Sequence, residues 1–81
     1  MKLNLSTPDK YFPPVEVDQV TLPTVKGEIM ILPGHAHLVS ELGKGMLTYQ
    51  SRSETKSFSI SQGVVEVEGD RIVVLADEVA A

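Results

Sequence analysis

Three side chains between residues 35 and 41 could bind a metal ion. His35, His37 and Glu41 have odd numbers, so all three would share one face of an extended strand. Two imidazoles and one carboxylate form a ligand set that zinc and non-haem iron sites use. The preceding Pro33-Gly34 pair predicts a type II turn, because proline fixes φ at its first central position and glycine can adopt the positive φ of its second.

The spacing His-x-His-x3-Glu is also similar to the first metal-ligand motif of cupins. A cupin would supply another histidine from a later strand, whereas this chain contains two histidines in all. It is also short for a double-stranded jelly roll. A small cupin-like metal-binding β-barrel that uses His35, His37 and Glu41 therefore stays as the alternative reading. The simpler interpretation is an exposed turn histidine followed by a histidine at the rim of the fold.

Other catalytic patterns are weak in this sequence. Ser40 follows the two histidines closely, but no separate acid, base and oxyanion site accompanies it. The Gly43-Lys44-Gly45 segment lacks the first glycine and the final hydroxyl residue of a phosphate-binding loop, so we interpret it as a tight turn. Glu66 and Glu68 would point to the same side of a strand, as a solvated pair on the last hairpin. We expect no catalytic residue, no metal and no cofactor.

Composition limits the possible partners. The formal net charge is −4, and the seven basic residues are scattered along the chain, which argues against nucleic acid. The four aromatic residues are dispersed among apolar positions, so we interpret them as core or rim packing. The absence of cysteine fits a reducing compartment. No apolar run approaches the roughly 20 residues that cross a bilayer, so we expect a soluble chain without a membrane span.

Hydrophobic residues alternate with a period of two, and proline and glycine interrupt the chain too often for a helix. This pattern predicts an all-β fold in which two packed sheets form a flattened sandwich or barrel. Residues 64–68 and 71–76 should form a hairpin around Gly69-Asp70. Residues 72–75 are apolar on both faces, which predicts a strand covered on both sides.

Nearly the whole chain resembles one family, the epsilon subunit of F-type ATP synthases (called delta in mitochondria). The similarity runs in order along the sequence rather than resting on one motif. Two departures are visible: His37 stands where the family usually has proline, and Met30 where a small residue is common. The matching segments are LNLSTPD (3–9), VDQVTLP (17–23), GEIMILPGHA (27–36), LVSEL (38–42), GML (45–47), SQGVVEV (61–67) and IVVLAD (72–77).

The resemblance implies a single domain over residues 1–81, a ten-stranded β-sandwich without the helical hairpin that follows it in many members. It implies a non-catalytic central-stalk subunit that couples the gamma subunit to the membrane c-ring of a proton-translocating ATP synthase. This complex would lie on the cytoplasmic side of a bacterial inner membrane, or on the stromal or matrix side in an organelle. Without the helical hairpin we expect no bound nucleotide. Lys26, Gly27 and Glu28 would face the ring, and Thr7, His35 and Ala36 would lie near gamma.

Overall fold

A computed structural model describes residues 1–34, 37–52 and 54–80 of the chain. The described part consists of ten β-strands joined by turns and loops, and it contains no helix that could cross a membrane. The strands are β1 (Lys2–Ser6), β2 (Val15–Glu16), β3 (Gln19–Thr24), β4 (Gly27–Ile31), β5 (Leu38–Leu42), β6 (Gly45–Gln50), β7 (Thr55–Ile60), β8 (Gly63–Glu68), β9 (Arg71–Ala76) and β10 (Val79–Ala80).

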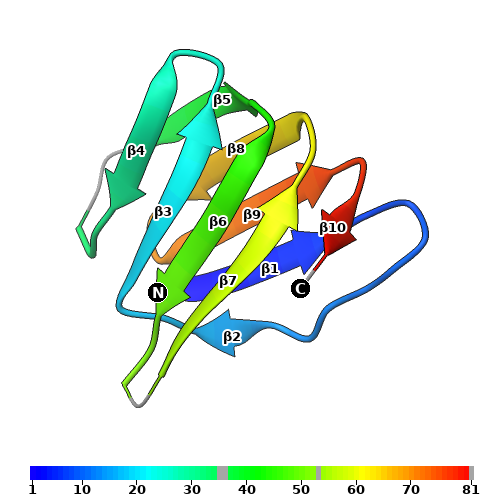
Figure 1. The fold of residues 1–81 in the computed structure, drawn as a ribbon. Coiled ribbons are helices and arrows are strands. Elements are labelled where there is room, and N and C mark those ends of the chain that lie inside the picture. Colours follow the sequence, from blue (N-terminus) through cyan, green and yellow to red (C-terminus); the bar gives the residue numbers. More distant parts are fainter. Residues whose placement is uncertain (35–36, 53, 81) are drawn as a thin grey trace.

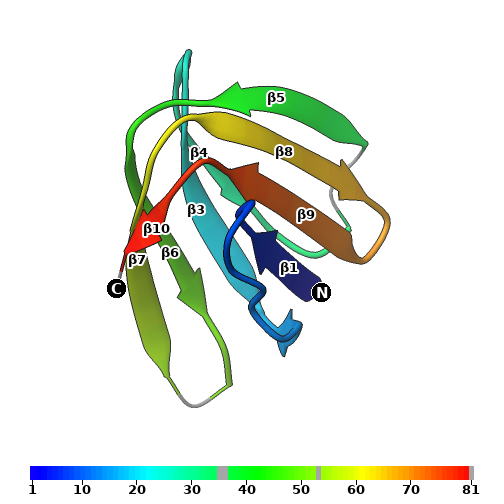
Figure 2. The same ribbon diagram turned by 90° about the vertical axis from the view of Figure 1, so that its right-hand side faces the viewer.

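The strands form two facing layers (Figures 1 and 2). The first layer contains β4, β3, β6, β7 and β10, and the second contains β5, β8, β9, β1 and β2. Neighbouring strands are antiparallel except for β1 and β9, which run parallel. The predicted all-β sandwich of ten strands is therefore confirmed. Its two layers are parts of one strongly curled sheet.

The layers join at a corner near the end of β3. There Thr24 pairs with Leu42 of β5, whereas the earlier residues of β3 pair with β6. Pro23 has no N–H to donate, and it is tolerated because the β3–β6 pairing has already ended at Thr21. Gly45 lets β6 begin beside this proline, since an added Cβ would lie 2.9 Å from the Pro23 Cβ.

The core fills the space between the layers. Alternate residues of each strand point inward, so that Leu22, Leu47, Val65 and Ile72 are fully buried. At the open side of the curl, the ring of Phe58 lies 6.0 Å from Phe12 and 6.2 Å from Tyr49 between centroids. These three aromatic rings pack as predicted. Tyr11 does not, because 75% of its surface is exposed.

The two glycines expected to adopt positive φ in turns do so. β8 and β9 pair through a loop of Gly69 and Asp70, where Gly69 has φ of 59°. Gly34 has φ of 82°, the value that a type II turn requires. The prediction that residues 72–75 are covered on both faces is wrong for the isolated chain. Ile72 and Val74 are buried, but Leu75 points outward and is 53% exposed because nothing in the described chain packs over this face.

Candidate functional site

The most distinctive surface lies on the outer side of the second layer. Val39 of β5, Val64 of β8 and Leu75 of β9 are exposed there, and the half-buried Val73 lies among them. The strand pairing makes this set contiguous, since Val64 is paired with Leu75 and Val39 with Glu66. We call Val39, Val64, Val73, Leu75 and Glu66 the apolar outer face. Contiguous exposed apolar side chains of this kind mark protein interaction sites.

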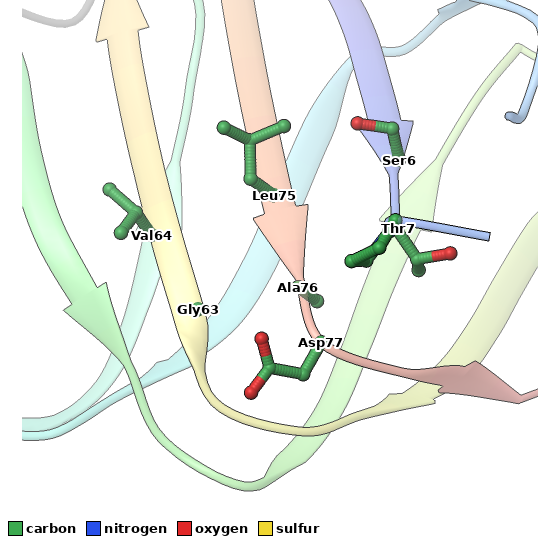
Figure 3. Close-up of a pocket in the computed structure, with 8 residues that line it drawn as sticks. Ser6, Thr7, Gly63, Val64, Leu75, Ala76 and Asp77 are labelled. Atoms are coloured by element: carbon green, nitrogen blue, oxygen red, sulfur yellow. The ribbon is translucent and has the colours of Figure 1, made fainter. Parts of the chain in front are cut away.

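An open hollow of about 430 Å³ adjoins this face where β1 ends (Figure 3). Val64 and Leu75 form one wall, and Ser6 and Thr7 lie across from Leu75 (Figure 3). Gly63 shapes its floor: an added Cβ would come within 2.7 Å of the Ala76 Cα, so this position admits no larger residue without moving β9.

The Thr7 hydroxyl holds the loop that borders the hollow. It accepts a hydrogen bond from the Lys10 N–H at 2.9 Å, and the Thr7 N–H donates to the Lys10 carbonyl at 3.0 Å. These bonds close a short turn directly after β1. Thr7 is thus a half-buried residue at one end of the apolar outer face.

The His37 imidazole lies close to the Glu66 carboxylate on the same side of the molecule. The His37 Nε2 lies 3.6 Å from the Glu66 Oε2, and both side chains are more than half exposed. The proposed metal ligand His35 lies outside the described residues. Within the described ranges no three histidine or acidic side chains are grouped closely enough to bind a metal ion. Glu66 and Glu68 are exposed, as predicted. Their strand, β8, lies between β5 and β9 rather than at an edge of the sheet, and their side chains point to its outer face.

A second candidate surface is the turn between β3 and β4. Thr24 is buried, and its hydroxyl donates to the Gly27 carbonyl at 2.5 Å and accepts from the Lys26 N–H at 3.2 Å. Gly27 itself has φ of 122°. The side chains of Lys26 and Glu28 project from this turn into solvent. The sequence reasoning selected Lys26, Gly27 and Glu28 but missed Thr24, which fixes their backbone.

The turn between β5 and β6 lies directly beside it. The Val25 N–H donates to the Glu41 carbonyl at 3.2 Å, and the Gly43 N–H donates to the Pro23 carbonyl at 2.9 Å. Gly43 makes this approach easier, because an added Cβ would lie 3.3 Å from the Thr24 carbonyl oxygen, a tight contact. The Gly43-Lys44-Gly45 segment is therefore a tight turn, as predicted, that supports its neighbour.

The predicted residues thus separate into two groups. Thr7 borders the apolar outer face, whereas the group from Lys26 to Glu28 forms the tip of a hairpin in the other layer. His35 and Ala36 lie outside the described residues. Val39, Val64 and Leu75 were not selected from the sequence, although the apolar run at residues 72–75 was a usable signal.

Comparison with known proteins identifies the family. The whole chain, residues 1–81, matches the family model for the β-sandwich domain of the ATP synthase delta/epsilon chain. The chain belongs to this family. It is 42% identical over 77 residues to the ATP synthase epsilon chain of Carboxydothermus hydrogenoformans, a match that covers 95% of this chain and 58% of that one. The epsilon chain of Rhodobacter capsulatus is 34% identical with the same coverage.

Solved structures of mitochondrial ATP synthases contain chains with the same fold. A chain in the cryo-EM structure of the Euglena gracilis mitochondrial ATP synthase, which includes its c-ring, superposes with a TM-score of 0.87 at 25% identity. That match covers 96% of this chain and 51% of the other. A chain from the central stalk and c-ring of the Tetrahymena thermophila enzyme gives a TM-score of 0.84 at 20% identity, with 96% and 63% coverage. This chain therefore spans somewhat more than half the length of its relatives.

Proposed function

We propose that this chain is the β-sandwich part of a non-catalytic central-stalk subunit in an F-type ATP synthase. In this role it couples the gamma subunit to the membrane c-ring during rotational ATP synthesis and performs no chemistry of its own. The observation that carries the proposal is the apolar outer face, which a protein working alone would have no reason to leave uncovered. Membership in the family names the assembly in which it would be covered.

The apolar outer face is the surface that we assign to gamma. Val39 and Leu75, on the two strands that flank β8, are 60% and 53% exposed, so each side chain can bury substantial apolar area on contact. Thr7, which the family resemblance places near gamma, borders one end of this face. His37 lies close to Glu66 and directly follows residues 35–36, the other positions that the resemblance assigns to gamma. The position of Thr7 and the exposure of the apolar outer face support this assignment.

The turn between β3 and β4 is the surface that we assign to the c-ring. Lys26 and Glu28 offer one charge of each sign on a backbone that the buried Thr24 hydroxyl fixes. A rigid polar turn suits contact with the polar loops of a ring because few backbone conformations are lost on binding. The assembled protein would be peripheral to the membrane, on the cytoplasmic side in bacteria or the stromal or matrix side in organelles.

Binding to purified gamma subunit tests the proposal. Leu75→Glu places a charge in the apolar outer face and should weaken gamma binding more than about tenfold, because burial of an unpaired carboxylate is costly. Met46→Glu is the matched control, since Met46 is 50% exposed on the opposite layer. This control should change the Kd less than about threefold, which isothermal titration calorimetry can measure. Equal affinity of both variants and the unmodified chain would contradict the assignment.

A further inference from the structure

Glu66 is the charged group at one end of the apolar outer face, with valines on three sides and Glu68 on the fourth. Glu66 is paired with Val39 on one side and with Val73 on the other, and Val64 lies two residues before it on the same face of β8. The Glu66 side chain is 52% exposed, so water now solvates its carboxylate. A partner that covers the surrounding valines must also cover this carboxylate and remove that water.

The described part of the chain offers Glu66 no permanent counter-charge within ion-pair distance. Its neighbour His37 carries a charge only when the imidazole is protonated. Of the other charged residues on this side of the layer, Glu41 and Glu68 are acidic. Arg71 is paired with Glu68 rather than with Glu66, and Lys2 lies beyond it on β1.

Burial of the Glu66 carboxylate without a cation would cost more than the neighbouring apolar contacts could return. A second copy of this chain is a poor occupant, because it would bring another acidic face with its own Glu66 into contact. The occupant must therefore combine apolar side chains with a positive charge.

On the basis of the proposed function, we propose that the gamma subunit presents an arginine or lysine side chain to Glu66 from within an otherwise apolar patch. Arginine fits this position better than lysine, since its planar guanidinium can donate two parallel hydrogen bonds to one carboxylate. Glu66 then determines specificity: apolar contacts supply the affinity, and the Glu66 carboxylate rejects surfaces that lack a cation.

The proposal is tested by measuring association and dissociation rates of gamma with isosteric variants of this chain. Glu66→Gln should weaken binding at least about tenfold, mainly through faster dissociation, because it leaves the basic side chain of gamma buried without its partner. Glu68→Gln removes a carboxylate from the same strand outside the apolar outer face. This control should change the Kd less than about threefold, through the association rate. Melting temperatures of both variants establish that the fold is retained.

Two outcomes would overturn the proposal. If Glu66→Gln leaves binding unchanged or tightens it, gamma supplies no cation, and the carboxylate is merely tolerated in the interface. If His37→Gln weakens binding as much as Glu66→Gln, and the double variant adds nothing, the histidine supplies the counter-charge. Failure of the proposed function is distinguishable from both, because Leu75→Glu would then bind gamma as well as the unmodified chain does.

Discussion

Thr24 illustrates how a single buried hydroxyl can determine a functional surface. Its hydroxyl donates to the Gly27 carbonyl and accepts from the Lys26 N–H, so one side chain pairs two backbone groups of the turn. Thr24→Val keeps the side-chain volume but removes both hydrogen bonds. We expect a loss of about 1 to 3 kcal/mol in the free energy of unfolding, because backbone polar groups then lack partners. Urea denaturation of the variant and the unmodified chain measures this difference in the free energy of unfolding.

The matched control for Thr24→Val is Thr21→Val. Thr21 lies on the same strand, but its side chain points outward and is partly exposed. That substitution should change the free energy of unfolding by no more than about 0.5 kcal/mol. Equal losses in the two variants would mean that the Thr24 hydroxyl has no special part in the turn.

The pairing of β8 with β9 depends on close backbone contact at one end and on an unusual backbone angle at the other. At Gly63 an added Cβ would meet the Leu75 carbonyl and the Ala76 Cα. Gly69 has open space around it but a φ of 59°. Gly69→Ala should therefore cost about 1 to 2 kcal/mol from backbone strain alone. Gly63→Ala should cost more than this, at least about 3 kcal/mol, because strands must separate.

Thermal and urea denaturation of the two glycine variants compare these effects directly. A Gly63→Ala protein as stable as Gly69→Ala would show that β8 and β9 can separate slightly at little cost. In that case the floor of the adjoining hollow would be more deformable than its packing indicates.

Local signals in the sequence predicted individual elements well. The alternation of apolar residues identified strands, and Gly69-Asp70 identified the last hairpin, because both depend on neighbouring residues. The parallel pairing of β1 with β9 and the corner at Thr24 and Leu42 join residues far apart in the chain. No local pattern encodes such contacts, so these features became visible in the structure alone. The family resemblance supplied the number of strands.

Only part of the candidate site was predicted, because the rest joins residues that are far apart in the chain. Lys26, Gly27 and Glu28 were selected by their position in the family resemblance, and they are adjacent in the chain. The apolar outer face collects residues from three strands, so it has no motif of its own. The apolar residues 72–75 did predict that both sides of β9 are covered. In the isolated chain Leu75 is exposed, and in our account gamma supplies the missing cover.

The molecule as a whole presents different chemistry on its two layers. The second layer has contiguous apolar side chains around Glu66 on its outer side. On the first layer the exposed Met30 and Met46 are separated by hydroxyl groups such as that of Thr48, whose oxygen lies 2.9 Å from that of Ser57. In the proposed role, this difference would let one small domain contact gamma through a sheet face and the ring through a turn. The central claim is that gamma covers the second layer.

The most direct test is the protection of engineered thiols, which the absence of native cysteine makes clean. Leu75→Cys, Met46→Cys and Lys26→Cys variants are alkylated with a maleimide alone, with gamma, and in a complex of gamma with the c-ring. Gamma should slow alkylation at position 75 at least about tenfold and leave position 46 unchanged, because a docked interface excludes water. Position 26 should be protected only when the ring is present. Protection at position 46 without protection at position 75 would contradict the account.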